Sequence, residues 1–358
     1  MRRVCLGVSL CIAACAIFVS AALAQDGPYK VLKAAKVGGE GGFDYVYADS
    51  AGRKLYVPRS GNPGRVSAYD LDALTLISEI PDVSGHGAAV DPKSHHGFVS
   101  SNPVAMFDSE SLKLIKTIQV QGGPDGILFD PFNQRVWVFS HRAPNATVIN
   151  TEDGSIAGTV DLGGAPEQAV TDGKGKLYVD LEDKSQIAEV DAAAMKVLRT
   201  FDLGGKGGGP GGLAFDAKNH ILFASCHEPA TMVILNSETG KVLDALPIGT
   251  GTDGATFNPA TMEAFSSNGD GTLTIIKENS PTSFAVEQNL KTMTRAKTLT
   301  LDAKTNHILL IAAETAPPPA APAGEAPAGQ GGGGRGGFGG RGRGAMVPGS
   351  FTILEVGK

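Results

Sequence analysis

Seven copies of one sequence pattern run along this chain of 358 residues, and their spacing constrains the fold more than any other feature. Each copy has a glycine-rich turn, a short apolar strand, an acidic or amide residue, and then a second, usually aromatic strand. The acidic or amide residues, called the anchors below, are Asp49, Asp91, Asp130, Asp172, Asp216, Asn258 and Asp302. A period of about forty residues built only of strand-like segments predicts a β-propeller in which each repeat forms one blade.

The second strand of each repeat is its most strongly apolar segment. Its centre follows the anchor by about seven residues, at Tyr56, Phe98, Trp137, Tyr178, Phe223, Phe265 and Leu309. Aromatic and β-branched residues suit the buried surface of a middle strand. These positions are therefore predicted to form the core between blades.

The seventh repeat lacks a fourth strand of its own, and the N-terminal segment offers a matching one. Residues 31–37 (VLKAAKV) are similar to residues 112–118 (LKLIKTI), the fourth strand of the second repeat, and a Gly-Gly pair follows each. Pairing the two chain ends in one blade would close the ring and leave no open strand edge. The sequence thus predicts an all-β, seven-bladed β-propeller whose N-terminal strand closes the last blade.

Short motifs in the repeats resemble those of a known family. Lys54–Val57 and Lys176–Val179 both read KLYV, and Gly122–Gly126 forms a Gly-Gly-Pro-Asp-Gly turn. These segments resemble the YVTN-type propeller repeat of YncE-like exported bacterial proteins, and the resemblance covers nearly all of the chain after its leader. It implies the propeller fold without a particular activity, since related propellers include lactonases, a lyase and surface proteins. The sequence departs from this motif at Phe223–Ser225.

The first 24 residues have the form of a signal peptide. Arg2 and Arg3 form a basic start, an apolar stretch follows, and the small-residue cleavage site ends at Ala24. We therefore expect a periplasmic or secreted protein. An acylation motif ending at Cys15 leaves a lipoprotein as the alternative.

Residues 25–358 are predicted to form one propeller domain with an insertion in its last blade. The insertion, residues 316–349, is rich in proline, glycine and arginine, and it has too few apolar residues to offset the entropy of ordering. We expect it to be disordered and to act as a linker or envelope tether. The formal net charge of −6 argues against a nucleic-acid partner, because such binding neutralises phosphates. After the signal no apolar run is long enough for a membrane span, and we expect a monomer.

Aligning the repeats places one residue from each at the mouth of the central channel. These first-ring positions, five residues before each anchor, are Asp44, His86, Asp125, Glu167, Gly211, Asp253 and Lys297. Carboxylates held close together repel one another, which raises some of their pKa values or requires a cation. A second ring follows each anchor by about eleven residues and, with its charged neighbours, contains Arg59, Ser60, Asn102, His141, Arg142, Glu182, His227, Gly269, Ala313 and Glu314.

Two interpretations of these rings stay open at this stage. In one, the residues are polar only because turns at a channel mouth are wet. In the other, the mouth binds a ligand through Asp44, His86, Asp125, Glu167, Asp253, Lys297, Arg59, His141 and His227. The candidate metal ligands are Asp44, Asp125, Glu167 and Asp253. Oxygen ligands suit a divalent cation such as Ca²⁺ or Mg²⁺, and imidazoles shift the preference toward transition metals.

The functional hypotheses follow from the second interpretation. The leading one is an exported propeller scaffold that binds a small molecule or an envelope protein at the channel mouth, without chemistry of its own. The alternative is a metal-dependent lactonase or lyase, in which the four carboxylates surround the ion and a histidine acts as the base.

Overall fold

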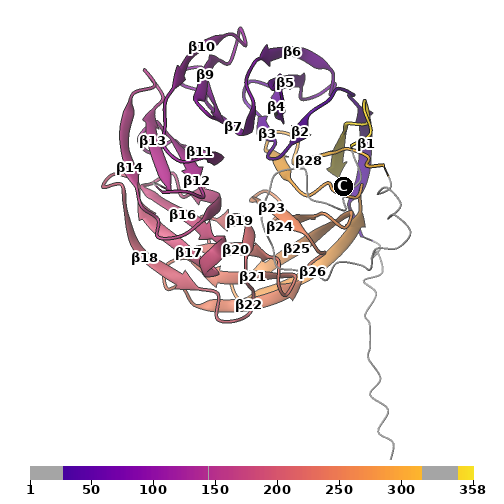
Figure 1. Ribbon diagram of the computed structural model, residues 1–358. Helices are drawn as coiled ribbons and strands as arrows, with labels where there is room; N and C mark the ends of the chain where they lie inside the picture. The colour runs from indigo at the N-terminus through magenta and orange to yellow at the C-terminus, as the bar shows by residue number, and fades with distance from the viewer. Residues whose placement is uncertain (1–26, 144, 317–345) are drawn as a thin grey trace, which may run out of the picture.

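The computed structural model describes residues 27–143, 145–316 and 346–358. Within these ranges the strands form seven antiparallel sheets arranged in a ring around a central axis (Figure 1). This confirms the predicted all-β, seven-bladed propeller. The predicted signal peptide and most of the predicted insertion lie outside the described residues. Among the described residues, no helix has the length and apolar character needed to cross a bilayer.

The first four blades follow one another in chain order, each from its inner strand to the rim. Blade 1 contains β2 (Gly42–Phe43), β3 (Tyr47–Asp49), β4 (Lys54–Ser60), β5 (Arg65–Asp70) and β6 (Leu76–Pro81). Blade 2 contains β7 (Gly85–Asp91), β8 (His96–Ser101), β9 (Val104–Asp108) and β10 (Leu114–Ile118). Blade 3 contains β11 (Pro124–Asp130), β12 (Arg135–Ser140), β13 (Ala146–Asn150) and β14 (Ile156–Val160). Blade 4 contains β15 (Pro166–Thr171), β16 (Lys176–Leu181), the 3-10 turn η1 (Glu182–Lys184), β17 (Gln186–Asp191) and β18 (Lys196–Asp202).

The last three blades continue the ring. Blade 5 contains β19 (Pro210–Asp216), β20 (Ile221–Cys226), β21 (Thr231–Asn236) and β22 (Val242–Pro247). Blade 6 contains β23 (Thr252–Asn258), β24 (Glu263–Asn268), β25 (Thr272–Ser280) and β26 (Ser283–Lys291). Blade 7 contains β27 (Leu299–Asp302), β28 (His307–Ala312), β29 (Thr352–Gly357) and β1 (Lys30–Lys36).

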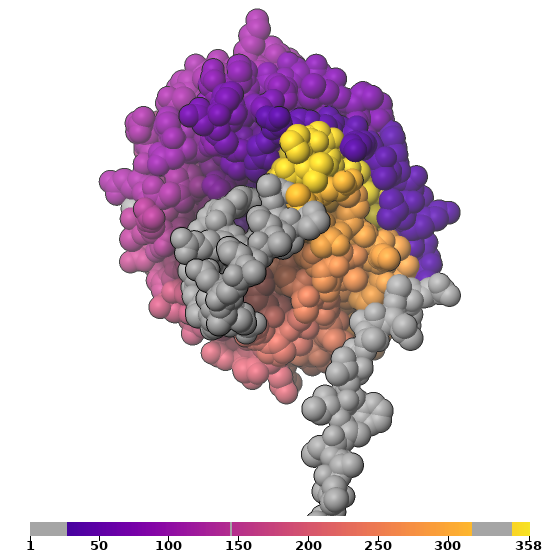
Figure 2. All heavy atoms as spheres, turned by 45° about the vertical axis from the view of Figure 1, so that its right-hand side comes forward, coloured from indigo at the N-terminus to yellow at the C-terminus, as the bar shows by residue number. Residues whose placement is uncertain are grey.

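The N-terminal strand completes the last blade. Its sheet has the order β1–β29–β28–β27, with Ala34 opposite Leu354 and Lys36 opposite Thr352. Figure 2 shows the C-terminal residues, in yellow, beside the indigo N-terminal segment and the orange strands of blade 7. The predicted closure of the ring by the two chain ends is therefore confirmed.

The core lies between adjacent blades, which explains why the middle strands are the most apolar. Trp137 and Phe139 of blade 3 belong to one buried cluster with Leu177 and Val179 of blade 4. A strand packed on both faces reads as a continuous apolar run rather than an alternating one. In β12 all residues after Arg135 are buried, as the sequence pattern predicts for a middle strand.

The anchors lie at or next to the end of each inner strand opposite the channel mouth, where they hold turns, and Asp130 and Asp91 also bond to the neighbouring blade. Asp130 accepts a hydrogen bond from the hydroxyl of Thr171 in blade 4, with an O–O distance of 2.9 Å. Asp91 accepts one at 2.7 Å from Thr151 in blade 3. Carboxylates that bond nearby backbone amides are typical of such turns. The repeat that dominates the sequence is therefore mainly structural at this end.

One anchor, Asp216, faces a second carboxyl group at the junction of blades 5 and 6. Glu278 is almost completely buried, and its Oε1 accepts a hydrogen bond of 2.7 Å from Asn219. Burial raises the pKa of Glu278 to about 7, and the nearby charge of Asp216 adds to the rise against the hydrogen bond from Asn219. The ionised form of Glu278 is therefore disfavoured in the folded protein.

We predict that Glu278→Gln stabilises the protein above pH 7. The contribution of neutral Glu278 to stability is complete below its ordinary pKa of 4.5 and is lost as pH rises through about 7. The variant should gain about 2 kcal/mol in the free energy of unfolding at pH 8.5 and change little at pH 4.5, as measured by urea denaturation. Glu238→Gln, at an exposed carboxylate, is the control and should show no such pH dependence. Equal stability of wild type and Glu278→Gln at pH 8.5 would contradict the prediction.

Candidate functional site

In five blades, a β-bulge near the start of the inner strand turns the first-ring position toward the channel mouth. Register shifts occur there in β7, β11, β15, β19 and β23. The second residues of these strands are the first-ring residues His86, Asp125, Glu167, Gly211 and Asp253. Asp44 and Lys297 lie in the loops just before β3 and β27. Bulges commonly re-aim a side chain at the rim of a barrel, and here they turn the first ring inward.

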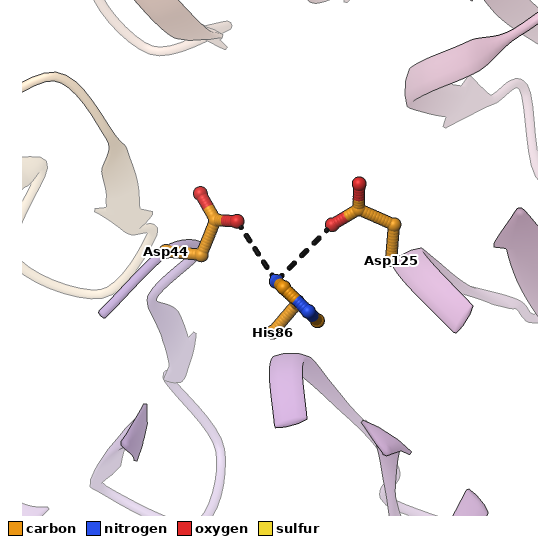
Figure 3. Close-up of side chains that lie close together, drawn as sticks. All are labelled: Asp44, His86 and Asp125. Atoms are coloured by element: carbon orange, nitrogen blue, oxygen red, sulfur yellow. Dashed lines mark hydrogen bonds and ion pairs between the residues drawn. The ribbon is translucent and has the colours of Figure 1, made fainter. Parts of the chain in front are cut away.

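The first-ring side chains of blades 1, 2 and 3 meet at one imidazole. His86 Nδ1 lies 3.0 Å from Asp44 Oδ2 and 3.4 Å from Asp125 Oδ1. Figure 3 shows the imidazole between the two carboxylates. Three predicted site residues from three blades are thus brought into direct contact.

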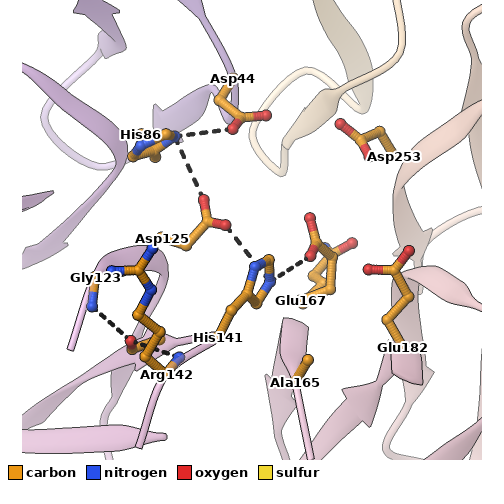
Figure 4. A network of polar contacts seen from close by, with 12 residues as sticks. Asp44, His86, Gly123, Asp125, His141, Arg142, Ala165, Glu167, Glu182 and Asp253 are labelled. Atoms are coloured by element: carbon orange, nitrogen blue, oxygen red, sulfur yellow. Dashed lines mark hydrogen bonds and ion pairs between the residues drawn. The ribbon is translucent and has the colours of Figure 1, made fainter. Parts of the chain in front are cut away.

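A second imidazole extends this cluster to blade 4. His141 follows the second strand of blade 3, and its Nε2 lies 3.6 Å from Asp125 Oδ2 and 2.8 Å from Glu167 Oε2. The result is a chain of alternating carboxylates and imidazoles across the mouth (Figure 4). We call it the mouth chain, and its members in order are Asp44, His86, Asp125, His141 and Glu167.

Lys297 and Asp253 flank the mouth chain. The ammonium of Lys297 pairs with Asp253 and lies 3.4 Å from Asp44 Oδ1. Figure 4 shows the carboxylates of Asp253 and Glu182 directed toward the same space as Glu167. The mouth therefore gathers five carboxylates around one ammonium group and the imidazoles.

His227 enters the mouth from blade 5, where the first-ring residue is glycine. A Cβ at Gly211 would lie 2.8 Å from His227 Nε2, so the imidazole occupies the space that a side chain would take. His227 Nε2 is 3.9 Å from Glu182 Oε1. Burial lowers the pKa of His227, which favours the neutral ring.

Arg59 is not brought together with the other predicted site residues. Its side chain is buried, with the guanidinium 3.3 Å from the ring centre of Phe351 in blade 7. Its Nη2 donates a hydrogen bond of 3.1 Å to the carbonyl oxygen of Glu40. A guanidinium over an aromatic face forms a cation–π contact, so Arg59 fastens the seam between blades 1 and 7.

Two side chains beneath the mouth chain escaped the sequence analysis. Tyr45 reaches from blade 1 to blade 4, where its hydroxyl donates to Glu167 Oε1 at 3.0 Å. Gln168 Oε1 accepts from the backbone amides of Leu213 and Ala255 at 3.1 Å each, and Gln168 also lines a cavity of about 230 Å³ in the lower channel. The available signal was a departure from the repeat, since the same position holds glycine in four other copies: Gly87, Gly126, Gly212 and Gly254.

The charges of the mouth chain are strongly coupled. Burial raises the pKa of Asp125 to about 6, and the charges of Glu167 and Asp44 add to the rise. Burial also opposes ionisation of Asp44, but the hydrogen bond with His86 and the charge of Lys297 outweigh it and lower its pKa. The hydrogen bond with Asp44 raises the pKa of His86 against the effect of burial. Negative charge is therefore crowded around Asp125, where a cation would be stabilised.

Within the described residues, two groups of three side chains can hold a metal ion. Their ligand atoms lie within 4.8 Å of one another, and the groups are Asp44–His86–Asp125 and Asp125–His141–Glu167. Asp253 belongs to neither group, and its carboxylate pairs with Lys297 instead. One imidazole and two carboxylates in each group favour a first-row transition ion over Ca²⁺ or Mg²⁺.

Comparison with known proteins gives a limited similarity. No family model matches the chain. Over 195 residues it is 20% identical to proteins named uncharacterized protein YncE from Salmonella typhi and from Salmonella typhimurium. The alignments cover 52% of this chain and 54% of each relative, so the chain spans about half the length of the curated relatives it matches. Together with the fold, this similarity supports a β-propeller scaffold with a resemblance to YncE.

Proposed function

We propose that this chain is an exported, YncE-like propeller of the YVTN type that binds a divalent transition-metal ion at its channel mouth. The observation that carries the proposal is the mouth chain, in which two imidazoles each lie between two carboxylates from different blades. The form of the first 24 residues supports export. The bound ion would offer open coordination positions to a small molecule or an envelope protein.

The distances within the mouth chain suit a coordination sphere. Metal–ligand bonds of about 2.0–2.2 Å place neighbouring ligand atoms about 3.0–3.5 Å apart. His86 Nδ1 is 3.0 and 3.4 Å from its two carboxylate oxygens, and His141 Nε2 is 2.8 and 3.6 Å from its two. All ligand atoms of each group lie within 4.8 Å of one another, so side-chain shifts could bring them to one ion, which would replace repulsion among the carboxylates with attraction.

A buried oxygen without a hydrogen bond, at the centre of the chain, gives further support. Asp125 Oδ1 is buried and accepts no hydrogen bond from any described residue, although His86 lies 3.4 Å away. Buried carboxylate oxygens are ordinarily hydrogen-bonded or bound to a cation, because their desolvation is otherwise uncompensated. A metal ion beside His86 would supply the missing partner.

We predict that Zn²⁺ or Mn²⁺ raises the thermal stability of the chelator-treated protein. Binding to the folded state at a free ion concentration of one hundred times Kd stabilises by about 2.7 kcal/mol, which is a rise of several degrees in melting temperature. The double variant His86→Ala, His141→Ala should lose this rise. His95→Asn, at an exposed histidine on the opposite end of the blades, should keep it. A wild-type melting temperature unchanged by Zn²⁺ and by Mn²⁺ would refute metal binding.

A metal-dependent lactonase or related ester hydrolase is the second candidate function. Each group offers three protein ligands, the number that catalytic zinc sites use while leaving a position for water or substrate. The imidazoles are also partly exposed, with 45% of the His86 side chain and 30% of the His141 side chain accessible. The test is hydrolysis of a simple lactone by Zn²⁺-loaded protein. Turnover no faster than with the double histidine variant would discard this candidate and leave metal binding untouched.

A further inference from the structure

We infer that the channel mouth holds two divalent first-row transition ions bridged by the carboxylate of Asp125. The inference rests on the proposed function, since it requires that the mouth binds metal at all. It adds the number of ions, their separate ligand sets and the residue that joins them.

Asp125 presents a different oxygen to each half of the mouth chain. Its Oδ1 faces His86 at 3.4 Å, and its Oδ2 faces His141 at 3.6 Å. Figure 4 shows the carboxylate of Asp125 between the two imidazoles. This is the arrangement of a bridging carboxylate, which gives one oxygen to each of two ions.

The ligand atoms form two sets rather than one. Among the described residues, Asp44 and His86 form a group with Asp125, and His141 and Glu167 form another with the same residue. A single ion would therefore engage one imidazole and leave the other with its carboxylate uncoordinated. Two ions use all five side chains, and the ions of such two-metal sites lie about 3.5–4 Å apart.

The excess of negative charge at the mouth also favours the binding of two ions. The carboxylates there belong to Asp44, Asp125, Glu167, Glu182 and Asp253, and they face one ammonium group, that of Lys297. With neutral imidazoles the excess is four negative charges, which one divalent ion halves and two neutralise. The five carboxylate side chains are at most 19% exposed, so solvent screens this repulsion only in part.

The backbone around Asp125 holds the two halves together. A Cβ at Gly126 would lie 2.5 Å from the carbonyl oxygen of Glu167, so only glycine lets blades 3 and 4 approach this closely. Tyr45 fixes Glu167 from below through its hydroxyl. Ligands held by strands and by buried partners are positioned before the metal arrives, which favours binding.

The test is the number of ions bound per chain. Purified untagged protein is stripped with a chelator, equilibrated with Zn²⁺, dialysed, and measured by elemental analysis against protein concentration. We expect two ions in the wild type and one in His86→Ala and in His141→Ala. Glu110→Gln removes an exposed carboxylate beside His95, at the opposite end of the blades, and it should keep two. Thermal denaturation of each variant checks that it is folded.

Electron paramagnetic resonance with Mn²⁺ tests the bridge. Two Mn²⁺ ions joined by Asp125 should give a spin-coupled spectrum in the wild type and in Glu110→Gln. His86→Ala and His141→Ala should each give the six-line spectrum of an isolated ion, and so should Asp125→Asn if it binds one ion.

The outcomes separate this inference from the proposed function. One ion per wild-type chain would overturn the two-ion centre and leave metal binding intact, whereas no bound ion would overturn both. Two ions that persist in His86→Ala or His141→Ala would overturn the ligand assignment. Two ions without magnetic coupling would overturn the bridging role of Asp125.

Discussion

Replacing Trp137 with alanine will lower the free energy of unfolding by about 3–5 kcal/mol. Trp137 is fully buried in β12, and it belongs to the buried cluster that contains Leu162, Leu177 and Val179 between blades 3 and 4. Removing the ring takes away its transfer free energy and leaves a cavity that two hydrogen-bonded sheets cannot close by moving together. Urea denaturation followed by circular dichroism measures the loss. Fluorescence would not serve, because Trp137 is the only tryptophan of the sequence.

Trp137→Phe is the matched control for this loss. The indole Nε1 of Trp137 is buried and has no hydrogen-bond acceptor among the described residues. Phenylalanine keeps most of the apolar volume and removes that unsatisfied donor, so the cost should stay below about 1.5 kcal/mol. Similar losses in both variants would mean that the cavity is not the cause. An alanine variant as stable as the wild type would place Trp137 outside the core.

The blade architecture was predictable because each repeat encodes one blade in its local sequence, and the repeat recurs along the chain. Each repeat contains the sequence signals of its own strands and turn. Buried middle strands, such as the one around Trp137, appear in the sequence as apolar runs. The similarity between residues 31–37 and 112–118 also predicted the closure, since both are fourth strands of blades. Aligning the repeats identifies equivalent positions in the seven blades, and this alignment alone places Asp44, His86 and Asp125 on one ring.

The contacts within the mouth were less predictable, because they depend on backbone irregularities that have no fixed residue signature. The bulge in β11 turns Asp125 toward two imidazoles, and a regular strand would have sent its side chain elsewhere. Counting from the anchors grouped Asp253 with the other carboxylates, although it lies in neither candidate metal group and pairs with Lys297. Counting from the anchors also grouped Arg59 with the mouth residues, because sequence position alone did not reveal which face of β4 its side chain occupies.

The closure of the ring depends on a buried carboxylate near both ends of the described chain. Glu263 in blade 6 is fully buried, and it accepts hydrogen bonds from the hydroxyl of Tyr29 and, at 2.8 Å, from the ammonium of Lys358. The backbone of Tyr29 is also held by the amide of Gln288, through two hydrogen bonds of 2.9 Å. The segment that leads into β1 is thereby fastened to blade 6. Glu263 joins this segment to the residue that follows β29.

Glu263→Gln should therefore destabilise the protein by about 3 kcal/mol at pH 7, because a neutral amide at this fully buried position weakens the charge-assisted hydrogen bonds from Lys358 and Tyr29. Burial opposes ionisation of Glu263, but the hydrogen bonds from Lys358, Thr261 and Tyr29 outweigh it and lower its pKa. Its contribution is complete above the ordinary pKa of 4.5 and is lost as pH falls through the lowered value, so the difference between variant and wild type should shrink in acid.

The neighbouring Glu287 provides a control of opposite sign. Burial, the hydrogen bond with Glu263 and the charge of Glu263 all raise the pKa of Glu287. Neutralising Glu287 relieves repulsion, so Glu287→Gln should leave the free energy of unfolding at pH 7 unchanged or increase it. Urea denaturation of both variants makes the comparison, and limited proteolysis should cut before β1 faster in Glu263→Gln than in Glu287→Gln. Equal losses of stability in the two variants would show that the charge on Glu263 does not fasten the ends, since a general effect of removing carboxylates at this junction would act on both alike.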